Sequence, residues 1–127
     1  MEQQWPVDKD NIVWMEAGRV VIGGMDRFLP FRSGSQQAVR IDCTMLEQAR
    51  REGLTGALTA SGTMAVCKEM GLPLAVTCGM GGIGNIAGEQ LCPDLPALPQ
   101  LPVALIATSP KDMLDIQATV DWLREHG

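Results

Sequence analysis

The pattern of apolar and polar positions divides the chain into two parts. The segment Asn11 to Gly24 contains two short apolar runs separated by the tripeptide EAG, a spacing that predicts a β-hairpin, and a loop is expected at 31–37. From Ala38 onwards, short apolar runs alternate with segments of helical periodicity, which is typical of strands joined by crossover helices. The chain is therefore expected to form an α/β fold with an amino-terminal β-hairpin.

The second part is expected to alternate strands and helices. Strands are predicted at 38–42, 55–60, 72–77 and 101–108. Helices are predicted at 44–53, 61–71 and about 110–126. Thr44 and Glu47 have the spacing of a capping box at the start of the first helix, and Gly71 is expected to end the second. The strand at 101–108 is apolar nearly throughout, as expected when both faces of a sheet are covered.

Between the last two strands, residues 78–100 are rich in glycine and proline and are expected to form a functional loop. Gly79, Gly81 and Gly84 spell G-x-G-x-x-G after a strand, but the prolines that follow cannot sustain the helix that a dinucleotide site requires. The pattern instead predicts a glycine-rich turn, including Gly82, whose backbone N–H groups can approach an anion. A tight turn that binds nothing is the alternative.

Composition narrows the class of protein. A length of 127 residues fits one domain, with 1–37 as a divergent hairpin and loop and 38–127 as the core. A net charge of −5 without a basic run argues against nucleic acid and anionic membranes as partners. No signal peptide or membrane-spanning run is evident, so a cytoplasmic location is expected. The four cysteines form no CxxC pair and are expected to be reduced, mostly buried thiols.

Lys111 is the first candidate for chemistry. With Ser109 as the N-cap and Pro110 at the first helical position, Lys111 would be the second residue of the last helix. There the positive end of the helix dipole disfavours an ammonium group by about 0.3–1 kcal/mol, and burial in a cleft would act in the same direction. The result would be a neutral amine that can attack a carbonyl group. A solvated surface lysine is the alternative.

Asp94, within the sequence LCPDLPALP, is the second candidate. Its carboxylate could be one ligand of a hard cation such as Mn²⁺ or Mg²⁺, which commonly keeps several waters. The alternative is a carboxylate that caps a helix or lies in a solvated turn. The segments that follow the parallel strands are expected to converge on one edge of the sheet, where ligands bind in such folds.

Four segments of the chain, in this order and spacing, resemble the pseudouridine-5′-phosphate glycosidases, also called the indigoidine synthase A family. These segments are GALTASGTMAV, LPLAVTCGMGGIG, CPDL and LPVALIATSPKDMLDIQATVDWLREHG. The resemblance covers Val39 to Gly127. It implies a three-layer α/β/α domain with a mostly parallel or mixed sheet, assembled as a homo-oligomer, usually a trimer. The implied reaction is reversible cleavage of the C–C glycosidic bond between uracil and ribose 5-phosphate, and the implied partner is a small phosphorylated sugar or nucleotide.

The resemblance also implies roles for individual residues. Lys111 matches the lysine that forms a Schiff base with C1 of the opened ribose, and Asp94 matches an aspartate that holds manganese through water. The positions implied to bind substrate are Arg40, where the family often has a second lysine, Thr59, Thr77, Gly79, Gly81 and Gly82.

Several positions depart from the family pattern. Gly84 and Asn85 replace a histidine and an arginine, and Arg40 cannot become a neutral amine as lysine can. Family members are also longer, and segments outside this chain supply a glutamate and an asparagine to the pocket; Glu16 is considered as a replacement for the glutamate. Three hypotheses follow: a sugar-phosphate C–C lyase, a phosphosugar- or nucleotide-binding module without catalysis, and an interaction subunit completed by another chain.

Overall fold

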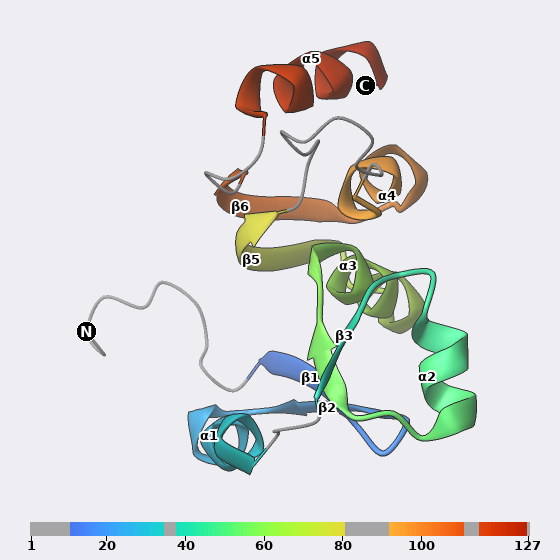
Figure 1. Cartoon of the computed structure of the whole chain (residues 1–127), viewed down its shortest axis with the longest axis vertical. Helices are drawn as coiled ribbons and strands as arrows, with labels where there is room; N and C mark the ends of the chain where they lie inside the picture. Colours follow the sequence, from blue (N-terminus) through green and yellow to red (C-terminus); the bar gives the residue numbers. More distant parts are fainter. Residues whose placement is uncertain (1–10, 35–37, 81–91, 111–114, 127) are drawn as a thin grey trace.

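The computed structural model describes residues 11–34, 38–80, 92–110 and 115–126 (Figure 1). Strands and helices alternate over most of the chain, which confirms the predicted α/β class. The strands are β1 (Ile12–Glu16), β2 (Arg19–Gly23), β3 (Val39–Ile41), β4 (Gly56–Leu58), β5 (Leu74–Met80) and β6 (Ala104–Pro110). The helices are α1 (Met25–Gly34), α2 (Leu46–Glu52), α3 (Ala60–Met70), α4 (Asp94–Gln100) and α5 (Ile116–His126).

The described strands form two sheets. The first has the order β2-β1-β4-β3, and the second contains β5 and β6. β1 and β2 form the predicted antiparallel hairpin, in which Ala17 and Gly18 have positive φ angles of 48° and 77°. β4 is antiparallel to β1 but parallel to β3, and β5 is parallel to β6. The sheet structure is therefore mixed, with both parallel pairs in the second part of the chain.

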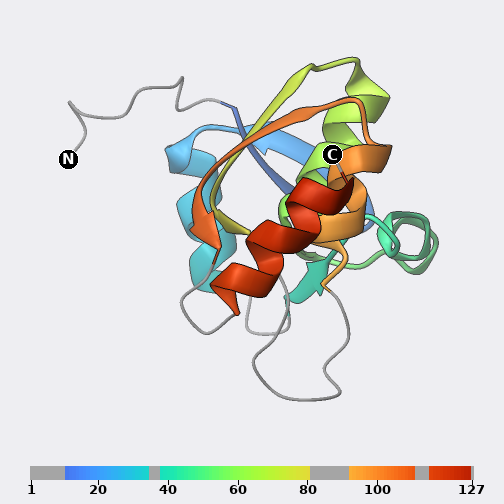
Figure 2. The same cartoon turned by 90° about the horizontal axis from the view of Figure 1, so that it is seen from above.

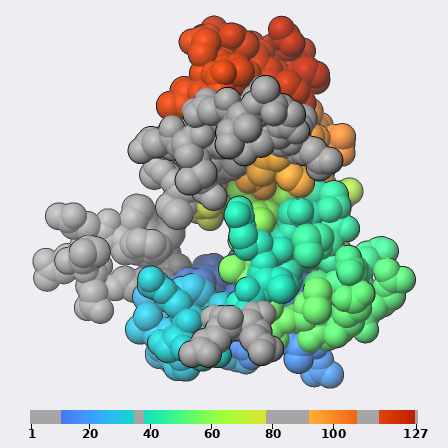
Figure 3. Space-filling model, in the orientation of Figure 1, coloured from blue at the N-terminus to red at the C-terminus, as the bar shows by residue number. Residues whose placement is uncertain are grey.

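Helix α3 links the two sheets through its side chains. Val66 packs with Met15 and Ile41 of the first sheet, whereas Met64 and Cys67 pack against β5 and the start of β6. Gly71 ends this helix with a left-handed backbone conformation, as predicted. Figure 1 shows α3 between the two sheets, and Figure 2 shows α5 lying across α4 and β6. The hairpin with α1 and the helix α5 lie at opposite ends of the long axis (Figure 3).

Two helices occupy segments that the sequence pattern did not predict to be helical. The predicted loop at 31–37 overlaps α1, where Phe28 and Phe31 pack their rings against the buried Trp14. The predicted loop at 78–100 contains the end of β5 and all of α4. Pro96 is tolerated in α4 because the first turn of a helix needs no donor from its backbone nitrogen.

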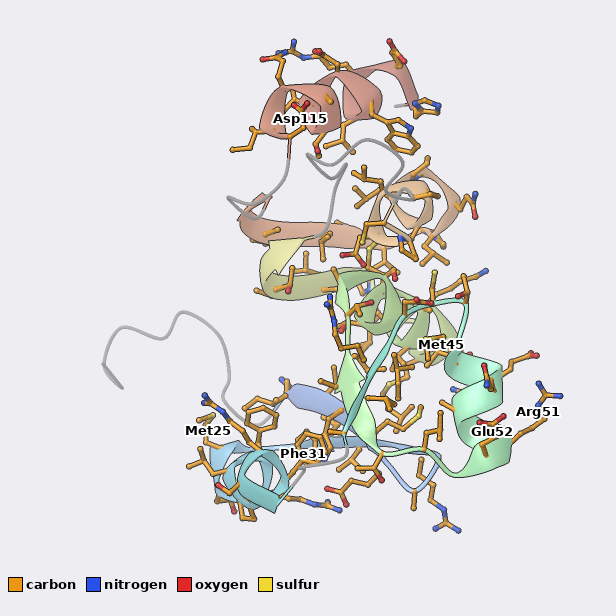
Figure 4. All side chains as sticks on the ribbon, viewed as in Figure 1. Met25, Phe31, Met45, Arg51, Glu52 and Asp115 are labelled. Carbon is orange, nitrogen blue, oxygen red and sulfur yellow. The ribbon has the colours of Figure 1, made fainter. Side chains whose placement is uncertain are left out.

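Two predicted helix starts are wrong. Ser109 and Pro110 are the last residues of β6 and pair with β5, so they do not begin the last helix. Helix α5 begins at Ile116, and Asp115 caps it by accepting the N–H of Ala118 at 2.9 Å (Figure 4). At α2, the predicted cap Thr44 donates its side-chain O–H and its N–H to Asp42 instead. None of the helices among the described residues is long and apolar enough to cross a membrane.

Candidate functional site

A cavity of about 230 Å³ lies where β3 and β4 end and α4 begins. It is lined by Arg40, Asp42, Thr59, Cys92, Pro93 and Asp94. The register pairs Ile41 with Leu58, so Asp42 and Thr59 follow the two parallel strands at the same edge. Three predicted site residues, Arg40, Thr59 and Asp94, therefore meet in one cavity at the carboxyl ends of parallel strands.

The amino terminus of α3 forms one wall of this cavity. Thr59 is the N-cap of α3, and its Oγ1 accepts the N–H of Gly62 at 3.3 Å. The backbone N–H of Thr59 donates to the carbonyl of Ile41 at 2.9 Å, which ties the helix start to β3. A Cβ atom on Gly62 would lie 2.3 Å from the same carbonyl oxygen, so only glycine fits there. Close packing of α3 on β3 thus fixes the position of Thr59.

Asp94 joins α4 to the same helix terminus. Its side chain is only 5% exposed, and Oδ1 accepts the backbone N–H of Ser61 at 2.8 Å. The positive end of the α3 dipole favours a carboxylate at this point. With Thr59 and Asp94 both bound to it, the helix start already has partners for two of its backbone donors, at Gly62 and Ser61. These two donors are therefore not free to bind an anion in the cavity.

Arg40 carries the positive charge of the cavity, and Asp42 and Asp94 carry negative charge. Asp42 Oδ1 accepts the N–H of Thr44 at 2.8 Å and its hydroxyl at 2.6 Å, which fixes the orientation of this carboxylate. Arg40 can bind a phosphate group through two of its N–H donors, and carboxylates accept hydrogen bonds from sugar hydroxyls. The arrangement suits a ligand with an anionic end and a hydroxyl-rich end.

Cys92 is a cavity residue that the sequence analysis did not single out. Burial raises the pKa of its thiol, and the negative charge and side-chain hydrogen bond of Asp94 add to the rise. A hydrogen bond with the Asp94 backbone and the charge of Arg40 act in the opposite direction. The net effect raises the pKa of the thiol and so favours its protonated form at neutral pH. The sequence signal that could have identified Cys92 is its position two residues before Asp94.

The described residues do not provide a site for a directly coordinated metal ion. Among them, no three His, Cys, Asp or Glu side chains lie close enough together to hold one. Asp94 is the predicted metal residue, and one of its oxygens already accepts the N–H of Ser61. An ion at Asp94 would therefore need water molecules for most of its coordination sphere.

The other predicted site residues lie elsewhere or outside the described residues. Thr77 and Gly79 are within β5, opposite Ala107 and Ser109, and neither lines the cavity. The glycine-rich turn therefore does not begin at Gly79, which is part of a strand. Lys111, Gly81 and Gly82 lie outside the described residues. Lys111 is not the second residue of α5, because this helix begins at Ile116.

Glu16, considered above as a substitute for a missing glutamate, lies in β1. Its Oε1 accepts the indole N–H of Trp14 at 2.7 Å, and it is not among the residues that line the cavity. The described cysteines Cys43, Cys67 and Cys92 are free thiols, as predicted, but of these three only Cys67 is buried, whereas most were expected to be.

Sequence comparison identifies similar proteins over nearly the whole chain. The family model described as "Indigoidine synthase A like protein" matches residues 11–127. The pseudouridine-5′-phosphate glycosidase of Methylobacterium nodulans is 30% identical over 118 residues, which cover 91% of this chain and 35% of that protein. The glycosidase of the same name from Alkaliphilus metalliredigens is 32% identical over 112 residues, which cover 87% of this chain and 36% of that protein. The chain therefore spans about a third of the length of the curated relatives it matches.

Solved structures share the fold. The crystal structure of the prealnumycin C-glycosynthase AlnA in complex with ribulose 5-phosphate matches with a TM-score of 0.80 and 22% identity. An indigoidine synthase A-like protein from Thermotoga maritima matches with the same TM-score and 23% identity. In both cases the match covers 91% of this chain and 39% of the solved chain. The backbone of the described residues thus reproduces one part of a larger known fold.

Proposed function

Because the chain belongs to the indigoidine synthase A like family, we propose that it contributes the phosphosugar site of an enzyme that cleaves or forms a C-glycosidic bond. The proposed reaction is reversible cleavage of pseudouridine 5′-phosphate to uracil and ribose 5-phosphate. The relatives named pseudouridine-5′-phosphate glycosidase and the AlnA complex with ribulose 5-phosphate support this choice of substrate class. The observation that carries the proposal is the convergence of Arg40, Thr59 and Asp94 on one cavity.

In this proposal, Arg40 binds the phosphate group of the sugar. Its guanidinium group offers parallel N–H donors, and the helix start beside it already has two donors engaged. Asp42 and Asp94 accept hydrogen bonds from sugar hydroxyls, and Thr59 contributes its hydroxyl group. Thr77, Gly79, Gly81 and Gly82 are proposed to contact the same substrate, on the strength of the motif resemblance.

Lys111 is proposed to be the catalytic nucleophile. Its neutral amine would attack the C1 aldehyde of opened ribose 5-phosphate, and loss of one water molecule would leave an imine. In the direction of bond formation, C1 of this imine would accept the ring carbon of uracil, and the sugar hydroxyl that closes the ribose ring would then displace the lysine amine; cleavage would run through the same steps in reverse. This role rests on the motif that contains Lys111.

Borohydride trapping tests this role. Intact mass is measured after the chain is incubated with ribose 5-phosphate and borohydride, which reduces an imine to a stable secondary amine. The wild type and Lys68→Ala, which changes an exposed lysine of α3, are expected to gain one reduced sugar adduct, whereas Lys111→Ala gains none. An adduct of equal yield in Lys111→Ala would contradict the proposal.

Mn²⁺ or Mg²⁺ bound through water at Asp94 is proposed as the cofactor. None of the roles proposed above for Arg40, Asp42, Thr59 and Lys111 requires this ion. Equilibrium dialysis with Mn²⁺ tests the assignment: Asp94→Asn is expected to lose the bound ion, and Asp121→Asn, on exposed α5 surface, is expected to keep it. Equal retention by both variants would remove Asp94 as the metal residue.

Phosphosugar binding without turnover is the second candidate function. The observation in its favour is that the chain spans about a third of the length of its relatives, so the residues that those relatives hold in their remaining length have no counterpart in these 127 residues. Saturable binding of ribose 5-phosphate with no borohydride adduct would select this function. A homo-oligomer, of which a trimer is the expected form, and a cytoplasmic location accompany both proposals.

A further inference from the structure

Ser61 is a buried polar residue that contacts three segments around the cavity. It is fully buried, its Oγ accepts the backbone N–H of Cys43 at 3.2 Å, and this Oγ lies 3.1 Å from Oγ1 of Thr59. Its backbone N–H donates to Asp94. Cys43 follows the end of β3, Thr59 caps α3 and Asp94 begins α4. Ser61 is not among the residues that line the cavity, so any effect on a ligand must pass through those that do.

The direction of the hydrogen bond between Ser61 and Thr59 follows from the number of protons and acceptors. Each hydroxyl group has one proton to donate and two lone pairs to accept with. Among the described residues, the acceptor within hydrogen-bond distance of the Ser61 hydroxyl is Thr59 Oγ1, because its contact with Cys43 uses a lone pair. A fully buried hydroxyl proton without an acceptor is unfavourable. Ser61 is therefore the donor and Thr59 is the acceptor.

This direction determines what the Thr59 hydroxyl can do in the cavity. Its Oγ1 accepts the hydroxyl proton of Ser61 and the N–H of Gly62 at 3.3 Å, so both lone pairs are engaged. The proton of the Thr59 hydroxyl remains to be donated, and no acceptor for it lies in the described part of the chain once Ser61 is the donor. Because Thr59 lines the cavity, this proton is available to a ligand there.

We propose that Ser61 is a positioning residue that makes the Thr59 hydroxyl a hydrogen-bond donor in the cavity. The ligand group that fits this donor is an oxygen without a proton, such as a phosphate oxygen, whereas the carboxylates of Asp42 and Asp94 accept from ligand hydroxyls. The choice of ribose 5-phosphate as the ligand rests on the function proposed above, but the proton arrangement does not.

A double-mutant cycle, measured by calorimetric titration with ribose 5-phosphate, tests this role. Ser61→Ala removes the donor to Thr59 and is expected to weaken binding about three- to tenfold, the effect of one hydrogen bond. Thr59→Val is expected to weaken binding at least as much. In the Thr59→Val background, Ser61→Ala should change the affinity by less than about twofold, because the group through which it acts is gone. An equal loss in both backgrounds, or no loss from Ser61→Ala in the wild type, would overturn the proposal.

Thr55→Val is the matched control. Its Oγ1 also accepts a backbone N–H, that of Ala17 at 3.0 Å, but Thr55 does not line the cavity, so this variant is expected to bind as the wild type does. Circular dichroism checks that every variant is folded.

Neutron diffraction from crystals of the deuterated wild type, without ligand, tests the proton arrangement itself. Deuterium is expected on Ser61 Oγ, directed at Thr59 Oγ1, and deuterium on Thr59 Oγ1 directed at Ser61 would overturn the proposal. This measurement also separates two failures. If the wild type does not bind ribose 5-phosphate, the proposed function fails, and the neutron density still decides the role of Ser61.

Discussion

Gly62 fixes the distance between α3 and β3 at the cavity. Its missing Cβ would lie 2.3 Å from the Ile41 carbonyl oxygen, which is part of the backbone and cannot rotate away. We expect Gly62→Ala to lower the free energy of unfolding by about 1–3 kcal/mol, the usual cost of overpacking. Gly34→Ala is the control, because nothing lies within 4 Å of its Cβ position. Urea denaturation that shows equal stability for the two variants would contradict this account of the packing.

Cys92 provides a test of the electrostatics in the cavity. Because burial raises the pKa of its thiol, the thiolate fraction at neutral pH is lower than that of a free cysteine. Iodoacetamide should therefore modify Cys92 more slowly than cysteine in the unfolded chain at about pH 7.5, and the difference should shrink as the pH rises above the raised pKa. Mass spectrometry of the modified peptide measures both rates. Faster modification in the folded chain would show that the pKa is lowered instead.

At the scale of single elements, sequence patterns predicted the hairpin, α3 and the strands β3 to β6. These elements depend on local features, such as alternation in the strands and Gly71 at the end of α3. The segments that were missed depend on contacts distant in sequence. Helix α1 is held by Phe28 and Phe31 against Trp14 and continues past Pro30, which lies inside it. The start of α5 depends on Asp115 rather than Ser109.

The cap of α5 is testable by substitution. Asp115 accepts the N–H of Ala118 through its side chain, so Asp115→Ala removes the partner of one backbone donor. We expect a loss of about 1 kcal/mol in unfolding free energy, the typical cost of losing an N-cap residue. Asp115→Asn keeps an acceptor oxygen, so this variant should retain most of the unfolding free energy that Asp115→Ala loses. If the alanine and asparagine variants unfold at the same urea concentration, Asp115 is not the cap.

Helices α2 and α3 are joined by an ion pair in which the two terminal guanidinium nitrogens of Arg50 each donate to one carboxylate oxygen of Glu69. The hydrogen bond from Arg50 lowers the pKa of Glu69. This stabilisation is therefore complete above the ordinary glutamate pKa and is lost as the pH falls through the lowered value. Because both side chains are more than a third exposed, Glu69→Gln should cost no more than about 0.2–1 kcal/mol at pH 7.

The pH and salt dependence of unfolding distinguish the loss of this ion pair from other effects of the Glu69→Gln substitution. The stability difference between the wild type and Glu69→Gln should shrink as the pH falls through the lowered pKa of Glu69, and it should also shrink in high salt. Glu125→Gln, an exposed change on α5, should show neither effect. A difference for Glu69→Gln that persists unchanged at low pH would contradict the assigned ion pair.

For the whole molecule, the sequence could predict part of the site but not its boundary. Arg40, Thr59 and Asp94 were found because the resemblance marks them, and the parallel strand ends bring them together. Asp42 and Cys92 were missed, since their place in the cavity depends on how α4 packs against α3.

The central claim is that the Arg40 cavity binds a phosphorylated sugar, and calorimetric titration with ribose 5-phosphate tests it most directly. The wild type and Arg51→Met, which changes an exposed arginine of α2, are expected to show the same saturable binding. Arg40→Met should bind at least about tenfold more weakly, because hydrogen bonds to a charged group contribute about 1.5–3 kcal/mol. Equal affinity in all three proteins, or no binding by the wild type, would contradict the account.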